Sequence, residues 1–218
     1  KMLQLVNILI VPGAYLIGSI PSSIWIGRIF FNTDVREYGS GNAGATNTFR
    51  VLGTKPGIIV FILDLMKGFL AVKLANLNPE LISNPEYFLT LQLILGVAAI
   101  LGHVFPLYVG FKGGKGVATL FGVILGISFI PTLIMAAVFF LVLFLTQYVS
   151  LSSITAGISF PILTLLIFNY DALPLIIFSM AIPVLIIFTH QKNIERLLNN
   201  TESKANLAKF GLRNRKRE

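Results

Sequence analysis

The chain has 218 residues, of which 55% are hydrophobic and only 12% charged, and its mean hydropathy is +0.83. Soluble domains carry about 25% charged residues, and disordered chains are poor in apolar residues, so the composition excludes both classes. We therefore expect an all-α integral membrane protein. The few charges are unbalanced, because 17 Lys and Arg against 9 Asp and Glu give a net charge of +8.

The rarest residue types exclude several kinds of site. The sequence contains no cysteine and only two histidines, His103 and His190. A disulfide framework, a thiolate zinc site, a cysteine nucleophile and a histidine-rich metal site are therefore excluded, and we expect no metal or cofactor. The first apolar stretch is too long for a signal-peptide core and lacks a cleavage pattern, so it is predicted to remain as a membrane span.

A membrane-spanning helix needs about 20 mainly apolar residues. Seven such segments are predicted, with the break between the fourth and fifth at Pro131: 3–31, 57–77, 87–109, 117–129, 131–148, 153–168 and 173–190. The fourth is short, and the glycine-rich loop before it is a candidate to extend it. Six spans are the alternative, if the segments on either side of Pro131 form one kinked helix.

The positive charges predict the orientation, because short cytoplasmic loops are rich in Lys and Arg. With seven spans, the loops 32–55, 110–116 and 149–152 share the side of the C-terminus. The first two carry five cations and the tail from 191 carries eight, against Lys1 and Lys73 on the opposite side. We therefore expect the N-terminus outside and the C-terminus in the cytoplasm. Six spans would divide the positive charge between the two sides.

Two units are expected: a single transmembrane domain over 1–198 and a basic cytoplasmic tail over 199–218. The cluster 213–217 is typical of a segment that binds lipid headgroups. Nothing in the sequence indicates nucleic-acid binding, because the basic residues have no accompanying aromatic or fold signal.

The first polar segment, 38–50, is rich in glycine, hydroxyl and amide side chains. Its glycines match the spacing G-x-G-x-x-G, but no strand or βαβ unit surrounds them, so a dinucleotide site is excluded. Exposed backbone N–H groups in such a loop can still hold an anion, although a flexible linker is an alternative. The candidate residues are Gly39, Ser40, Gly41, Asn42, Gly44, Thr46, Asn47 and Arg50.

The second polar segment, 102–119, places glycines and lysines before a predicted helix. It is not a Walker A loop, because its spacing is one residue short and no Ser or Thr follows the lysine. Glycine N–H groups, a helix N-terminus and lysine together favour a phosphate; a simple positive anchor is the alternative. The candidates are His103, Lys112, Gly113, Gly114, Lys115, Gly116 and Thr119.

The third polar segment, 189–198, follows the last span. On a helix, His190, Asn193 and Leu197 share one face, and Lys192, Glu195 and Arg196 in part share another. His190 and Asn193 are therefore candidates to bind or deprotonate a hydroxyl. A solvated helix end is the alternative. Within the second span, Asp64 and Lys67 are predicted to form an ion pair that faces the bundle, with direct participation in the site as the second interpretation.

All three polar segments lie on the predicted cytoplasmic side. In order and spacing they resemble the three motifs of bacterial acyl-phosphate-dependent glycerol-3-phosphate acyltransferases, over essentially the whole chain. Two positions depart from the family pattern: Ala43 stands where relatives commonly have Pro, and the usual Gly is missing before Glu202 and Lys204.

The resemblance implies transfer of a fatty acyl group from acyl phosphate to the 1-hydroxyl of sn-glycerol 3-phosphate, giving lysophosphatidic acid and phosphate. This would be the first step of phospholipid synthesis at the bacterial cytoplasmic membrane, with the active site facing the cytoplasm and the soluble acyl-phosphate synthase as a partner. It further implies that 113–116 hold acyl phosphate and that Ser40 and Arg50 engage phosphate. His190 and Asn193 would position glycerol 3-phosphate, supported by Glu195, Glu202 and Lys204.

Two other functions are alternatives. A small transporter of a phosphorylated solute would fit the spans, but no internal repeat or interrupted helix pair indicates a site at mid-membrane. A serine acyltransferase with Ser40 as nucleophile and His190 as base lacks an orienting carboxylate and the G-x-S-x-G elbow. Acyl phosphate is itself activated, so no covalent enzyme intermediate is needed.

Overall fold

The computed structural model describes residues 2–205, with the side chains of 9–78 and 81–205, and this part of the chain is helical without strands. Three short 3₁₀ turns (Val35–Glu37, Leu74–Leu77 and Leu107–Val109) and a π-helical turn (Leu163–Ile167) accompany the helices. The helices are α1 (Met2–Ser19), α2 (Ser22–Phe31), α3 (Ala45–Val51), α4 (Thr54–Lys73), α5 (Pro79–Ile82), α6 (Pro85–Val104), α7 (Val117–Ile127), α8 (Phe129–Thr146), α9 (Val149–Ile162), α10 (Leu173–Thr189) and α11 (Gln191–Leu198).

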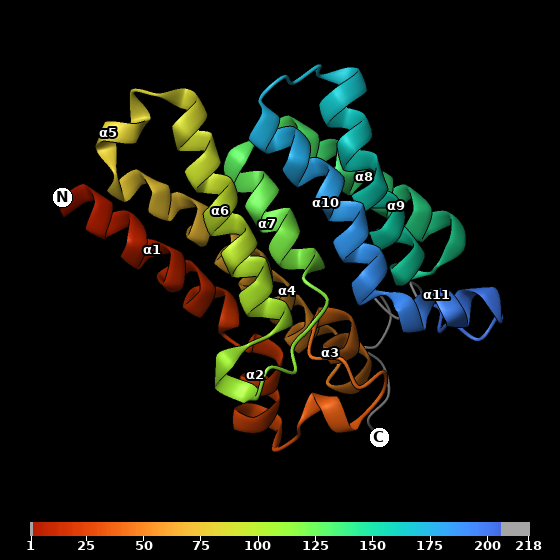
Figure 1. Cartoon of the computed structure of the whole chain (residues 1–218). Coiled ribbons are helices and arrows are strands. Elements are labelled where there is room, and N and C mark those ends of the chain that lie inside the picture. Colours follow the sequence, from red (N-terminus) through yellow and green to blue (C-terminus); the bar gives the residue numbers. More distant parts are fainter. Residues whose placement is uncertain (1, 206–218) are drawn as a thin grey trace.

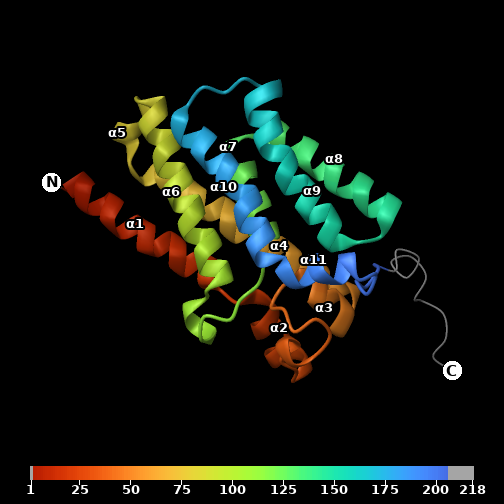
Figure 2. The ribbon, with the colours of Figure 1, turned by 45° about the vertical axis from the view of Figure 1, so that its right-hand side comes forward.

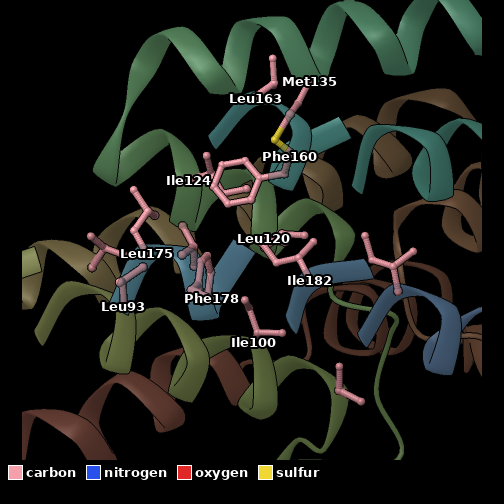
Figure 3. Close-up of a cluster of buried hydrophobic side chains, with 14 residues drawn as sticks. Leu93, Ile100, Leu120, Ile124, Met135, Phe160, Leu163, Leu175, Phe178 and Ile182 are labelled. Carbon is pink, nitrogen blue, oxygen red and sulfur yellow. The ribbon is translucent and has the colours of Figure 1, made fainter. Parts of the chain in front are cut away.

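The long helices form two neighbouring groups (Figures 1 and 2). α1 packs on α6 and α4 on α7 in one group, and α8, α9 and α10 form the other. Buried side chains of α6, α7, α9 and α10 meet between the groups, among them Ile100, Leu120, Phe160 and Phe178 (Figure 3). The short helices α2, α3 and α11 gather at one end of the bundle.

Glycines allow the closest helix contacts. A Cβ on Gly18 would lie 2.1 Å from the Ala99 carbonyl oxygen, and one on Gly122 would lie 1.9 Å from that of Leu65. The backbones of α1 and α6, and of α4 and α7, therefore touch directly. Small residues at such crossings are typical of helix packing in membranes.

Three helical stretches are long and apolar enough to cross a membrane: Pro85–Val109, Phe129–Thr146 and Val149–Ile167. Two bent pairs, α1 with α2 at 43° and α10 with α11 at 66°, raise the number to five if each is one span. The two remaining predicted spans correspond to α4, which carries four charged residues, and to the 11-residue α7.

Two predicted boundaries differ from the structure. The segment 3–31 is not one continuous helix, because it breaks at Ile20 and Pro21 between α1 and α2. The break before α8 lies at Ser128, whose backbone is extended, and Pro131 lies inside the first turn of α8. Proline is tolerated there because the first N–H groups of a helix have no partner within it.

Candidate active site

The turn 113–116 rests on the end of α6. The N–H of Gly113 donates to the carbonyl of Val104 (3.2 Å), and the N–H of Gly114 donates to that of His103 (3.1 Å). A Cβ on Gly114 would lie 2.2 Å from His103 Nε2, so only glycine fits there. Gly116 has φ of +82° and directly precedes Val117, the first residue of α7. The turn therefore presents Lys115 directly before a helix N-terminus, where anions are favoured.

Lys115 is the first member of a polar network that joins four segments. Its ammonium donates to Asn193 Oδ1 on α11, and Asn193 Nδ2 donates to Glu202 Oε1 (2.8 Å). Glu202 also accepts from Ser150 Oγ on α9 (2.9 Å) and from Arg196 Nε (2.7 Å). The carboxylate is buried and fully engaged, so it fixes Asn193 and, through it, Lys115.

The charges of this network perturb one another. Burial lowers the pKa of Lys115 to about 8; nearby Glu202 opposes this, while Arg196 and Arg50 add to it. Burial raises the pKa of Glu202, but hydrogen bonds from Arg196, Asn193 and Ser150 outweigh it and leave the pKa below its usual value. At neutral pH the site therefore holds one carboxylate among three cations, which favours an anionic ligand.

His190 lies between α10 and α11 and is only 2% exposed. Its Nδ1 is 2.9 Å from the carbonyl oxygen of Ile186, which can only accept, so we assign the ring proton to Nδ1. Nε2 is then the atom with a free lone pair. This tautomer is suited to accept a hydrogen bond or a proton from a hydroxyl.

The first polar segment folds around Asn47 at the start of α3. Asn47 is buried; its Oδ1 accepts from the N–H of Ser40 (2.8 Å), and its Nδ2 donates to the carbonyls of Val35 (2.6 Å) and Tyr38 (3.1 Å). It shapes the loop from within, whereas Ser40 lies on the surface of that loop. The predicted residues Gly39, Gly41, Asn42, Gly44 and Thr46 are also exposed or half-buried there.

Two links attach this loop to the rest of the site. Arg50 on α3 donates to the carbonyl of Ser203 (3.3 Å), in the segment after α11. Arg36 donates to Asp34 and to the carbonyl of Val109 (3.1 Å), before the glycine turn. The hydrogen bond from Arg36 lowers the pKa of Asp34 well below its usual range. All three polar motifs are therefore in contact at one end of the bundle.

The remaining predicted residues occupy different places. Lys112 and Glu195 are exposed, and Lys204 lies over the ring of Tyr148 at 5.5 Å. Thr119 and His103 are buried inside the bundle, with 0% and 6% exposure.

The predicted pair of Asp64 and Lys67 is confirmed, with 2.9 Å between Asp64 Oδ1 and Lys67 Nζ. Ser150 and Arg196 are members of the network that were not predicted as site residues. The sequence signal for Ser150 is the group of three serines, at 150, 152 and 153, at the start of an otherwise apolar span. Within the described range, no group of three His, Asp or Glu side chains is placed to hold a metal ion.

Comparison with known proteins identifies the family. The sequence profile described as glycerol-3-phosphate acyltransferase matches residues 8–200. The chain belongs to this family. Relatives named glycerol-3-phosphate acyltransferase are 50% identical in Staphylococcus carnosus, over 88% of this chain and 94% of that protein, and 44% identical in Streptococcus pneumoniae, over 95% and 96%.

Two solved structures share the family fold. The crystal structure of PlsY, an integral membrane glycerol 3-phosphate acyltransferase, in its glycerol 3-phosphate form matches with a TM-score of 0.82 and 36% identity, over 94% of this chain and 98% of that one. The form with lysophosphatidic acid matches with a TM-score of 0.77 and the same identity, over 91% and 94%. The family expected from the three motifs is confirmed.

Proposed function

We propose that this protein transfers a fatty acyl group from acyl phosphate to the 1-hydroxyl of sn-glycerol 3-phosphate. The observation that carries the proposal is the direct hydrogen bond from Lys115, in the glycine turn, to Asn193, one helical turn from His190. This hydrogen bond joins the turn proposed to bind phosphate to the helix end where His190 can accept a hydrogen bond from the substrate hydroxyl. The related PlsY structures in glycerol 3-phosphate and lysophosphatidic acid forms support this substrate and product.

The reaction is a single displacement at the acyl carbon. The hydroxyl oxygen forms the new ester bond, the bond from the acyl carbon to the phosphate oxygen breaks, and inorganic phosphate leaves with the electron pair. The hydroxyl proton goes either to His190 Nε2 or to the leaving phosphate. Lys115 and Arg50 supply positive charge where the oxyanion develops, which is the larger part of catalysis in such reactions.

Each polar segment has a distinct role in this proposal. The turn 113–116 holds the donor phosphate through the Lys115 ammonium and the N–H groups of Lys115 and Gly116 at the start of α7, while those of Gly113 and Gly114 fix the turn to the end of α6. Ser40 with Arg50 engages phosphate from the first loop. His190 and Asn193 position glycerol 3-phosphate. Glu202 holds Asn193 in place, while Glu195 and Lys204 flank that end of the site.

We further propose seven spans, formed by the α1–α2 pair, α4, α6, α7, α8, α9 and α10. The buried pairing of Asp64 with Lys67 reduces the cost of placing α4 in lipid. The positive loops then put the site, α3 and α11 at the cytoplasmic face of the bacterial inner membrane, where a soluble acyl-phosphate synthase would supply the donor. The basic tail is part of this proposal, but its cluster 213–217 lies outside the described residues.

The test uses the purified protein in lipid with palmitoyl phosphate and labelled glycerol 3-phosphate. It measures the release of phosphate and the formation of labelled lysophosphatidic acid. We expect release only when both substrates are present. Lys115→Ala and Arg50→Ala should each lower kcat/KM by about a hundredfold or more, the scale for removing one stabiliser of a developing oxyanion. Lys55→Ala is the matched control, because Lys55 is an exposed cation outside the site.

A folded protein that forms no lysophosphatidic acid would overturn the proposal. Uptake of labelled glycerol 3-phosphate into liposomes without acylation would instead indicate a transporter. Equal rates with acyl-CoA or acyl carrier protein as donor would leave an acyltransferase but remove the acyl-phosphate assignment.

A further inference from the structure

A second group of buried charges lies beneath the glycine turn. Asp64 and Lys67, on α4, are 2% and 5% exposed, and their side chains are 2.9 Å apart. The ring of His103, at the end of α6, packs against this pair: its Nδ1 lies 3.7 Å from the same carboxylate oxygen of Asp64, in van der Waals contact and without a hydrogen bond. The proposed reaction uses neither Asp64 nor Lys67. Charged side chains inside a membrane protein are costly and usually functional, so this cluster calls for a role.

One side of the cluster is attached to the junction of α1 and α2. Lys67 Nζ donates to the carbonyl of Ile20 (3.1 Å), directly after the last residue of α1. The last carbonyls of a helix have no partner within it, and a cation is favoured beside them. Lys67 therefore fixes α4 and its partner Asp64 to the point where the chain bends into α2.

The other side of the cluster is in contact with the glycine turn. The Gly114 backbone lies against the His103 ring, and a Cβ on Gly114 would also meet the carbonyl oxygen of Ala43 at 2.7 Å. The turn is thus held between His103 and the first polar loop. A cavity of about 10 Å³ lies at this junction, between Ser22, Asp64, His103 and Gly114. This space is no larger than about one water. Because the Gly114 backbone is in contact with the His103 ring, a shift of His103 displaces the turn.

We propose that Lys67 and Asp64 are positioning residues that hold His103 against the turn 113–116, and so hold Lys115 at Asn193. They touch no substrate and act through the turn. The inference rests on the proposed function for its kinetic consequence: losing the pair weakens binding of the phosphate group held by the turn. We therefore expect a higher KM for acyl phosphate and a smaller effect on the KM for glycerol 3-phosphate.

The structure offers a matched control on the same helix. Lys73 also donates from α4 to a backbone carbonyl, that of Gly126 (2.9 Å), but at the C-terminal end of α7, away from the glycine turn. Lys67→Met and Lys73→Met therefore each remove one lysine-to-carbonyl bond from α4. The double variant Asp64→Asn/Lys67→Met removes both charges of the pair, so it avoids the penalty of one buried unpaired charge.

The experiment measures both KM values, kcat and the thermal midpoint of the full-length protein in lipid. We expect the double variant to raise the KM for acyl phosphate by about tenfold while the KM for glycerol 3-phosphate changes by less than about threefold, and Lys73→Met to stay within about twofold of wild type. An active double variant with wild-type KM values would overturn the inference. A lower apparent kcat and a lower thermal midpoint, with both KM values unchanged, would show that the pair only stabilises the fold.

Binding of inorganic phosphate, measured by calorimetry, is the second readout and does not need catalysis. The double variant should bind phosphate about tenfold more weakly than wild type, and Lys73→Met should not. If the wild type forms no lysophosphatidic acid, the proposed function fails while this binding difference still tests the positioning role. Equal phosphate affinity in wild type and double variant would refute that role.

Discussion

Asn193 joins two oppositely charged groups, and its amide is the side chain that suits both. Its oxygen accepts from the Lys115 ammonium and its nitrogen donates to the Glu202 carboxylate. A carboxylate in this position would repel Glu202, and an apolar side chain would leave both neighbours short of a partner. Asn193 therefore sets the distance between cation and anion without adding charge to the site.

The lowered pKa of Lys115 predicts how activity depends on pH. Lysine is charged below its pKa, so the cation that we propose to hold phosphate is lost as pH rises through about 8. We expect kcat/KM for acyl phosphate to fall above this pH, measured from pH 7 to 10 after subtracting the rate of donor hydrolysis in buffer. Lys55→Ala should keep the same profile. A constant kcat/KM up to pH 10 would contradict the assignment of Lys115 as the phosphate-binding cation.

At the scale of elements, the contact of α4 with α7 positions the glycine turn of the site. α7 begins at the glycine turn, and its Gly122 lies directly against the backbone of α4 at Leu65. The pair Asp64 and Lys67 lies on the same stretch of α4. The position of α7 along α4 therefore decides where Lys115 meets Asn193.

A methyl group at this crossing should separate the two helices. Gly122→Ala places a Cβ 1.9 Å from the Leu65 carbonyl oxygen, and overpacking of this kind costs about 1–3 kcal/mol. We expect a lower thermal midpoint in detergent. Gly13→Ala on α1 is the control, because a Cβ there meets nothing within 4 Å and alanine is the better helix former. Equal midpoints for the two variants would show that the crossing is not tightly packed.

At the scale of the whole molecule, the polar motifs gather at one end of the bundle, and the loop between α9 and α10 lies at the other (Figure 2). The proposed seven spans place these ends on opposite sides of the membrane. Three crossings, α7, α8 and α9, separate Lys112 from Asp171, whereas one kinked helix in place of α7 and α8 would put both on the same side. The seven-span and six-span arrangements therefore differ in a measurable way.

The absence of cysteine from the sequence makes labelling a direct test. We expect Asp171→Cys to react with a membrane-impermeant maleimide on intact cells, and Lys112→Cys and Lys192→Cys to react only after permeabilisation. Labelling of Asp171→Cys and Lys112→Cys from one side would support six spans. The opposite pattern at all three positions would reverse the orientation.

Local patterns predicted well where the relevant geometry is local. The ion pair of Asp64 and Lys67 follows from a spacing of three residues on a helix, and the structure confirms it. The three motifs were sufficient for the family, which the comparisons confirm. The bend at Ile20 and Pro21 was missed, because a run of apolar residues does not show where one helix turns into another.

The sequence by itself determined the helical class, the family and the three polar segments, because hydropathy and short-range spacing depend on neighbouring residues alone. Only the tertiary structure decided which polar residues face one another. In the structure, Asn47 lies at the centre of the first loop, His103 is buried beneath the glycine turn, and Ser150 donates to Glu202. Such relations depend on contacts between residues far apart in the sequence, such as Ser150 with Glu202, 52 positions apart, and Arg50 with Ser203, 153 positions apart, which no local pattern encodes.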